Sequence, residues 1–499
     1  MSYTVVNKLR RFYIQLQYKN GGHFMDIITI FQVLLRWGVF ALIGGLLLAL
    51  TIFAGYMIYK KAFHGQRSMS KTQGIILFFL SCWLLLVLAL TTLSRGANFT
   101  DSFNIDFFSA YVNAWNKWSI SELQLIIFNM LMFTPLGFLL PLFWKKAEKF
   151  EVIFFVSVGL TVCIEILQLL TGTGIFELDD LFHNCIGSLF GYFCTMAVLS
   201  VIREKRIRLA PIGKVLIFPC FIGMIIGTVS LVYARQPYGN MPILPAVRQD
   251  MSRTQITTDL SLADQPATAS LYKNAYTGDQ DYIERMAAQL SESEEVTFAG
   301  IQRREGENRV YTGKNPTSEE VQLNFFFRTG HWRYTTWHDT TKLTVEAAKN
   351  RGAFYKNWLK ESGLLPDTAV FTLQNNDTLR WDVPEKNNLS IAKTAFTSGS
   401  VLMQFDSNLE LASMDYGISW NEYVTTEEII SPKAAFEQVE DGNFEQYVPF
   451  RQGDILWVKE CKLTYVYDTK GFYQPVYRFT GYINNKDNSW DCQIPALAR

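Results

Sequence analysis

The sequence lacks the motifs of a soluble metalloenzyme and of a nucleic-acid-binding protein. Its seven cysteines and five histidines form no CxxC motif and no His/Cys cluster with zinc spacing, so we predict neither a metal site nor a cofactor. The basic footprint of a protein that binds nucleic acid is also absent. Five of the cysteines lie in apolar runs, and Cys461 and Cys492, the two outside them, would pair only in an oxidising compartment.

The pattern of a signal peptide is also absent from residues 1–26, because no compact apolar core with a small-residue cleavage site occurs there. We therefore expect no cleaved signal peptide. Residues 1–26 contain four basic side chains and are predicted to form an N-terminal tail. Whether translation starts at Met1 or at Met25 stays open.

The net charge of zero hides two halves of opposite sign. Residues 1–239 contain 20 Lys/Arg and 11 Asp/Glu, a net charge of +9, and residues 240–499 contain 26 and 35, a net charge of −9. The long apolar runs lie in the basic half. We therefore predict an α-helical polytopic membrane domain of five to six transmembrane helices at 27–233 and an α+β domain at 234–499.

Six apolar runs are each close to the ~20 residues that a transmembrane helix requires. They are Trp37–Tyr59, Gly74–Leu93, Leu123–Trp144, Val152–Leu170, Asn184–Ile202 and Val215–Tyr233. Lys and Arg gather in the first, third and fifth connecting loops, which the positive-inside rule assigns to the cytoplasm. The α+β domain is then extracytoplasmic. This topology also places the basic N-terminal tail outside, unless the first segment is re-entrant or interfacial.

The acidic half alternates helix and strand signals. Helical periodicity and capping residues predict helices at Asp281–Leu290, Val345–Glu361 and Pro432–Val439, the last with Ser431 as N-cap. Alternating apolar residues predict a hairpin near the C-terminus, in which 454–467 pairs with 473–482. These signals together predict an α+β fold.

Three of the apolar runs contain polar residues at similar depth. These are Asn129 in the third run, Glu165 and Gln168 in the fourth, and Asp179, Asp180, His183 and Asn184 at the start of the fifth. From the helical rise, Asn129 lies about 9 Å and Glu165 about 7.5 Å below the outer boundary. Ionisable and amide groups at such depth are costly, which favours a functional site.

Each of these residues also has a structural interpretation. The three amides could join helices by hydrogen bonds, and Asp179 and Asp180 could favour a helix N-terminus. His183 could be an interfacial histidine that packing and solvation explain. Gly187 and Gly191 share a helix face with Asp180 and Asn184 and form a small-xxx-small pair, which is typical of close helix packing.

Three motifs in order resemble the VanZ-like membrane family over about residues 80–202. They are N-x3-F-x-P-x-G (Asn129, Phe133, Pro135, Gly137), E-x2-Q (Glu165, Gln168) and F-x2-DD-x3-N-x2-G-x3-G (Phe176, Asp179, Asp180, Asn184, Gly187, Gly191). The resemblance implies a bacterial cell-membrane protein of the envelope, associated with resistance to the glycopeptide antibiotic teicoplanin and its lipidated relatives. Many members carry an Arg just before the acidic motif, whereas Thr171–Ile175 contains none, which puts contact of that Arg with an anionic ligand in doubt.

Three functions remain open at this point. The first is an outer-leaflet polar pocket, formed by the seven polar residues and packed by Pro135, Gly137, Gly187 and Gly191. It would bind membrane lipids, a lipid-linked envelope precursor or a lipidated antibiotic. The second is an intramembrane enzyme in which Glu165 and Asp180 supply acid and base groups. The third is an extracytoplasmic sensor or interaction module with a membrane anchor. No nucleophile–base pair is visible, which favours the first.

Overall fold

A computed structural model describes most of the chain. The described residues are 27–64, 66, 68–93, 103–205, 209–305, 308–316, 318–384, 388–446 and 448–498. The predicted N-terminal tail lies outside them. The chain divides into two compact units, which we name the membrane unit (25–114 and 120–236) and the sheet unit (237–499 with 115–119). The boundary between the membrane domain and the α+β domain, placed at 233/234 from the sequence, remains a prediction.

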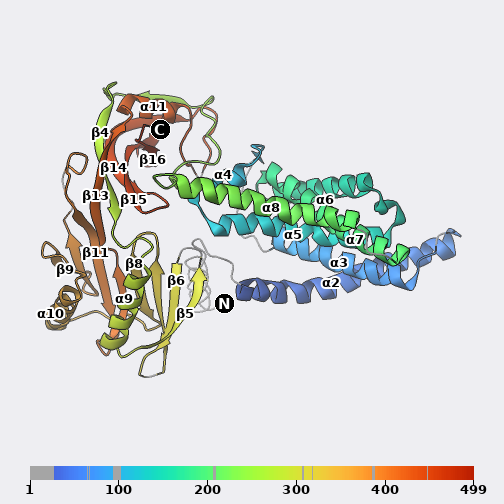
Figure 1. Cartoon of the computed structure of the whole chain (residues 1–499), viewed down its shortest axis with the longest axis horizontal. Helices are drawn as coiled ribbons and strands as arrows, with labels where there is room; N and C mark the ends of the chain where they lie inside the picture. Colours follow the sequence, from blue (N-terminus) through green and yellow to red (C-terminus); the bar gives the residue numbers. More distant parts are fainter. Residues whose placement is uncertain are drawn as a thin grey trace. The chain divides into compact units, whose positions relative to one another are not determined.

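The membrane unit confirms the predicted transmembrane helices. Six helices of the described chain are long and apolar enough to cross a membrane (Figure 1): α2 (Ile27–Ala62), α3 (Lys71–Leu88), α5 (Ile120–Phe143), α6 (Phe150–Thr171), α7 (Leu178–Glu204) and α8 (Leu209–Arg235). Helix α7 begins six residues before the predicted run at Asn184. Asp179, Asp180 and His183 therefore lie within its first two turns.

Short elements join these helices. They are the π-helix η1 (Ala89–Leu93), the strand β1 (Phe103–Asn104), the helix α4 (Ser109–Lys117), the 3₁₀-helix η2 (Lys145–Glu148) and the strand β2 (Phe176–Glu177). Strand β1 pairs with β2 in parallel, Phe103 opposite Phe176. The segment between α3 and α5 is thereby joined to the segment between α6 and α7.

Helices α5 and α7 pack so closely that glycine is required at the contact. A Cβ added to Gly187 would lie 1.6 Å from the Met130 carbonyl oxygen, and one added to Gly191 would lie 2.0 Å from that of Thr134. The second contact lies four residues after the first on both helices, from Gly187 to Gly191 on α7 and from Met130 to Thr134 on α5. The two helices therefore run parallel. On α5, a Cβ at Gly137 would lie 1.7 Å from the Ser188 oxygen.

Pro135 removes one hydrogen bond from α5, and α3 contacts the neighbouring carbonyl. Proline has no N–H, so the Leu131 carbonyl, four residues earlier, has no helical donor, and neighbouring helices can satisfy such backbone groups. The Trp83 Nε1–H on α3 donates to the Met132 oxygen at 2.7 Å. Its ring also meets Phe133 edge-on, with 5.5 Å between centroids. This contact fastens α3 to α5.

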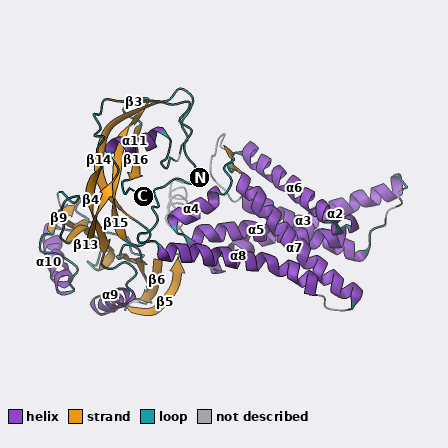
Figure 2. Ribbon diagram, turned by 45° about the horizontal axis from the view of Figure 1, so that its top comes forward, coloured by secondary structure: helices purple, strands orange, loops and turns teal. Residues whose placement is uncertain are grey.

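The sheet unit is an α+β fold, as predicted. Its strands form a 14-stranded mixed sheet in which β3 and β14 pair in parallel and the other pairs are antiparallel (Figure 2). The strand order is β3-β14-β15-β4-β13-β11-β12-β8-β7-β6-β5. Outside this path, β16 pairs with β15, β10 pairs with β11, and β9 pairs with β10. The bounds are β3 (Gln255–Thr258), β4 (Ala267–Asn274), α9 (Gln280–Ser293), β5 (Thr297–Glu305), β6 (Asn308–Lys314), β7 (Glu320–Phe326), β8 (His331–Thr336), α10 (Val345–Glu361), β9 (Val370–Gln374), β10 (Thr378–Val383), β11 (Phe396–Phe405), β12 (Leu411–Tyr416), β13 (Ser419–Ile429), α11 (Pro432–Glu440), β14 (Ile455–Tyr467), β15 (Phe472–Ile483) and β16 (Ser489–Pro495).

Side-chain caps fix the helix starts of the sheet unit. The Thr344 hydroxyl accepts the Ala347 N–H at 3.2 Å, the Ser431 hydroxyl accepts the Ala434 N–H at 3.1 Å, and Asp279 caps α9 in the same way. Such a cap contributes about 1 kcal/mol. The three helices therefore begin where the sequence predicts.

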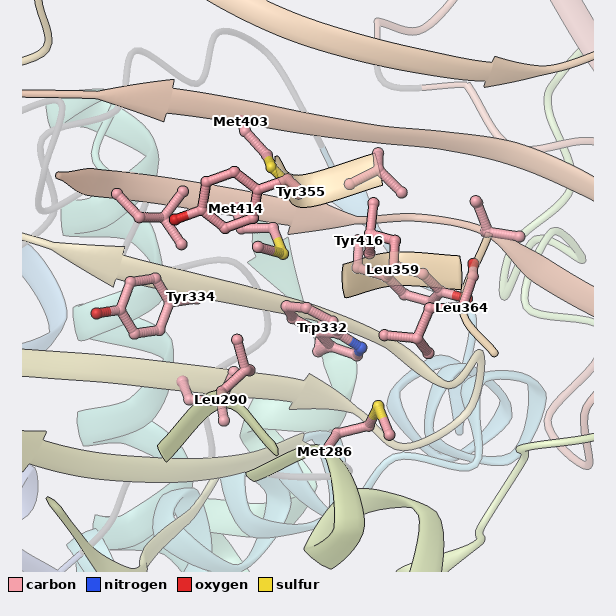
Figure 3. Packing of buried hydrophobic residues seen from close by; sticks show 14 of the residues in the cluster. Met286, Leu290, Trp332, Tyr334, Tyr355, Leu359, Leu364, Met403, Met414 and Tyr416 are labelled. Carbon is pink, nitrogen blue, oxygen red and sulfur yellow. The ribbon is translucent and has the colours of Figure 1, made fainter. Parts of the chain in front are cut away.

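Two large apolar clusters form most of the core of this unit, and a smaller third one contains Tyr272, Phe396 and Tyr465. One lies between the strands and helices α9 and α10, where the rings of Trp332 and Tyr416 stack at 5.0 Å (Figure 3). The other is built from α11 and β14–β16, with Leu456 and Phe479 fully buried. The two clusters cover different parts of one continuous sheet.

The two cysteines of the sheet unit are not paired. Cys461 on β14 and Cys492 on β16 are both opposite Phe479 of β15, one on each side. They are therefore separated by two strand spacings of about 4.8 Å, beyond the ~7 Å Cα limit of a disulfide. Both thiols are free.

Candidate functional site

The predicted polar residues meet at one end of the membrane unit, where α5 and α7 begin and α6 ends. We call Asn129, Glu165, Gln168, Asp179, Asp180, His183 and Asn184 the polar cluster. The Asn129 amide donates to the Asp180 Oδ1 at 2.6 Å, which joins α5 to α7. The Glu165 Oε2 of α6 accepts the Glu177 N–H at 3.3 Å, directly before α7. The three helices lie side by side in both views (Figures 1 and 2).

Asp179 holds helix α4 in place. Its Oδ1 accepts the Phe108 N–H at 2.7 Å, and its Oδ2 accepts the Ala110 N–H at 2.8 Å and the Ser109 hydroxyl at 3.1 Å. The side chain is 2 % exposed. A carboxylate at this position satisfies the unpaired N–H groups of the first turn and the positive end of the helix dipole. Both oxygens of Asp179 are thus occupied by the protein itself.

His183 connects α7 to α4. Its Nε2 lies 3.0 Å from the Tyr111 hydroxyl, and its Nδ1 lies 3.9 Å from the Asp180 Oδ1. Burial, and then the negative charge of Asp179, raise the pKa of Tyr111 to about 12. Tyr111 therefore keeps its proton at neutral pH. The tyrosine hydroxyl, the imidazole and the Asp180 carboxylate form one connected polar surface.

Gln168 and Asn184 present buried acceptors. The Gln168 amide donates to the Thr91 carbonyl oxygen at 3.3 Å. Within the described part of the chain, neither the Gln168 Oε1 nor the Asn184 Oδ1 has a hydrogen-bond partner. Leaving a buried polar atom unpaired costs about 1–3 kcal/mol. The His183 Nδ1 is a third such atom, and three in one cluster indicate that water or a ligand completes it.

Aromatic side chains surround the polar cluster. Phe103, Phe107 and Phe108 are 62, 45 and 49 % exposed. Phe107 packs against Phe182 of α7 with 5.3 Å between centroids, and Phe108 packs against Tyr111 at 5.7 Å. We call these exposed phenylalanines the aromatic rim. The aromatic rim thus lies beside the residues that Asp179 and His183 contact.

The sequence did not reveal α4, Tyr111 or the partners of Asp179. Helix α4 has nine residues, too few to show a clear apolar period. The groups that Asp179 accepts from include two backbone N–H groups, and no side-chain pattern encodes those. Ser157 and Thr161 were also missed, although they stand eight and four residues before Glu165 on one helix face.

The sheet unit has a polar pocket of about 420 Å³ over β8, β10, β11 and β12. Its charged groups are paired: Arg333 bonds Asp415, and His338 lies between Glu319 at 2.7 Å and Asp406 at 3.2 Å. The hydrogen bond with Glu319 is the main cause that raises the pKa of His338. These internal pairs explain the charges of the pocket without a ligand.

The six apolar helices define the class: a multi-pass membrane protein. The family model described as VanZ/LLP1 matches residues 47–200, from α2 to α7. The resemblance seen in the three motifs is therefore confirmed, and this part of the chain is a VanZ-like membrane region that contains the whole polar cluster.

Comparisons with other proteins add little to this assignment. No curated protein matches the chain. An uncharacterized protein from Eubacterium rectale ATCC 33656 is similar in structure over 48 % of this chain and 87 % of its own, at 11 % identity and a TM-score of 0.22. The YpeB C-terminal domain of Bacillus megaterium covers 44 % and 98 %, at 11 % identity and a TM-score of 0.19. Similarities of this size carry no argument about function.

Proposed function

We propose that the polar cluster binds the headgroup of an envelope lipid or of a lipidated ligand, and that the protein thereby contributes to resistance to teicoplanin and related lipoglycopeptides. One observation carries the proposal. Carboxylate and amide groups from α5, α6 and α7 converge, most of them buried, beside an exposed aromatic rim, and among the described residues the Gln168 Oε1, the Asn184 Oδ1 and the His183 Nδ1 have no hydrogen-bond partner.

The chemistry of the cluster selects the ligand. Carboxylate oxygens accept hydrogen bonds and carry negative charge, so Glu165 and Asp180 favour a headgroup with hydroxyl or ammonium donors. Thr171–Ile175 contains no arginine, so this segment offers no guanidinium to a phosphate. The aromatic rim supplies apolar surface for an acyl chain. A glycosylated or amine-bearing amphiphile satisfies both requirements.

The orientation is part of the proposal. Lys145, Lys146 and Lys149 precede α6 at the end opposite the polar cluster, and the positive-inside rule favours the cytoplasm for that end. The cluster then faces the outer leaflet, and the domain after residue 234 is extracytoplasmic. It has its own caps and core, so residues 240–499 expressed alone should unfold in one cooperative transition and should not restore resistance by themselves. A non-cooperative melt would refute the domain assignment.

Isosteric substitutions test the function. Glu165→Gln and Asp180→Asn keep the shape and hydrogen-bonding capacity but remove the charge. We expect both variants to lose resistance in a teicoplanin survival assay while protein level and melting temperature stay near those of the wild type. Glu151→Gln is the matched control, since Glu151 is an exposed residue in the first turn of the same helix, and it should keep full resistance. Normal resistance from a stably expressed Glu165→Gln protein would refute the proposal.

A further inference from the structure

A second polar feature runs through the membrane unit beyond the polar cluster. On α6, Ser157, Thr161, Glu165 and Gln168 are spaced by four, four and three residues, which is one helix face. On α7, Asp180, Asn184, Ser188 and Tyr192 are spaced by four. All are buried except Asp180, which is half-buried. Both helices therefore turn a polar face into the bundle, away from lipid.

The register of α6 and α7 brings these two faces to the same depths. The helices are antiparallel neighbours. At one end Ile153 and Tyr192 share an apolar cluster, and Phe150 lies 6.4 Å from Tyr192 between ring centroids. Each residue rises about 1.5 Å along either helix. Ser157 lies four residues after Ile153 on α6, and Ser188 lies four residues before Tyr192 on α7, so both lie at the same depth.

Continuing along both helices gives the remaining levels. Thr161 and Asn184 lie eight residues from Ile153 and Tyr192, respectively, and therefore share a second depth. Glu165 and Asp180 lie twelve residues away and share a third. The contact between Glu165 and the Glu177 N–H supports this register at the far end. The polar groups thus occur at successive depths where α6 and α7 meet, and Asp180 also accepts a hydrogen bond from Asn129 of α5.

Three hydroxyls of this seam lack protein partners among the described residues. In the described chain, the Ser157, Thr161 and Ser188 hydroxyl oxygens have no hydrogen-bond partner, and each residue is at most 1 % exposed. Serine and threonine in a membrane helix usually bond the carbonyl one turn back; Thr91, for example, bonds Val87. Buried unpaired polar groups are commonly completed by ordered water, which needs two to four polar partners.

The seam continues to the opposite end of the bundle. The Tyr192 hydroxyl donates to the Glu148 carbonyl oxygen at 2.8 Å, in the turn that precedes α6. Glu148 is itself paired with Arg203 at 2.7 Å. From Glu165 to the start of α6 at Phe150, the helical rise amounts to about 22 Å. Polar groups therefore occur at intervals from one end of α6 to the other.

From this arrangement we infer that the seam between α6 and α7 holds a file of water and conducts protons across the membrane unit. Each water or hydroxyl accepts a proton from one neighbour and passes its own to the next, so one proton enters at one end for each that leaves at the other. No bond to carbon changes. The described titratable and charged groups at the cluster end include Tyr111, Glu165, Glu177, Asp179, Asp180 and His183, and those at the opposite end are Lys145, Lys146, Glu148, Lys149, Glu151, Arg203, Glu204 and Lys205.

Proton flux into vesicles tests the inference directly. The full chain is reconstituted in liposomes that contain a pH-sensitive dye, and a potassium diffusion potential drives protons inward. We expect wild-type vesicles to acidify faster than protein-free vesicles. Ser157→Ala with Ser188→Ala removes two hydroxyls and should lower the protein-dependent flux about tenfold or more, because the loss of one hydrogen bond from the path already costs about tenfold.

Two further variants separate conduction from folding. Ser157→Thr retains the hydroxyl and should keep the flux. Ser200→Ala makes the same change on α7 at a hydroxyl that bonds its own helix at Ala197, and it should also conduct normally. Wild-type flux equal to that of protein-free vesicles, or full flux from the folded double-alanine variant, would overturn the inference. No antibiotic or added ligand is present, so this result is independent of the proposed binding function.

Discussion

Asp179→Asn should destabilise the membrane unit although the change replaces one oxygen by an amide. The two carboxylate oxygens of Asp179 accept three hydrogen bonds from Phe108, Ser109 and Ala110. The amide keeps one acceptor oxygen and presents a donor to at least one N–H group. A lost hydrogen bond to a charged group costs about 1.5–3 kcal/mol, and the lost charge at a helix N-terminus about 0.5–1 kcal/mol.

The expected loss of unfolding free energy is therefore about 2–4 kcal/mol. For a domain of this size each kcal/mol lowers the melting temperature by roughly 2–4 °C, so a decrease of roughly 4–16 °C is expected in detergent. Asp180→Asn is the matched control. The Asp180 carboxylate accepts a hydrogen bond from the Asn129 amide, and an asparagine oxygen can still accept it, so the melting temperature of this variant should stay near that of the wild type. Equal melting temperatures for both variants would refute the assigned role of Asp179.

Three other predictions concern packing, topology and pH. Gly191→Leu should sharply lower the melting temperature, because even a Cβ at this position would lie 2.0 Å from the Thr134 oxygen. The control Val198→Ile, at an exposed position of α7, should leave the melting temperature unchanged, and equal effects of the two changes would contradict the close helix contact. A cysteine at Lys205 should be protected from a membrane-impermeant thiol reagent in intact cells, whereas one at Ser252 should react; the same outcome at both would refute the topology. Protonated His338 pairs with Glu319 and its pKa is raised in the folded state, so its contribution to stability is full below the unfolded pKa of ~6.5 and is lost as the pH rises through the folded pKa. His338→Gln should therefore lower the melting temperature more at about pH 5.5 than at about pH 8.5, on either side of that unfolded value, and a pH-independent effect would contradict this.

The sequence predicted those parts of the fold that depend on neighbouring residues alone. Apolar runs of sufficient length predicted all six described membrane helices, and helical periodicity, with Ser431 as N-cap of the last, predicted the starts of the three sheet-unit helices to within one residue. The strand order of the sheet was not predicted, because it depends on pairings between distant segments such as β13 with β4. Such pairings leave no local pattern.

The candidate site was predictable in its residues but not in its contacts. The cost of polar groups in a membrane singled out Glu165 and Asp180, and helical spacing placed Asn184 with Asp180. The sequence did not show that the two adjacent acids make different contacts. Asp179 accepts hydrogen bonds from backbone groups of α4, whereas Asp180 accepts one from the Asn129 amide. Only the three-dimensional arrangement separates a residue that positions a helix from one that faces the cluster.

Native mass spectrometry of the purified protein tests the central claim most directly. Wild-type protein, Glu165→Gln and the control Glu151→Gln are compared for the lipids they retain and for binding of added teicoplanin. Loss of a charge-assisted hydrogen bond should weaken binding about tenfold or more. The proposed site predicts that wild type and Glu151→Gln hold an amphiphile with hydroxyl or ammonium donors, or added teicoplanin, that Glu165→Gln loses. Identical lipid retention and teicoplanin binding in all three proteins would contradict it.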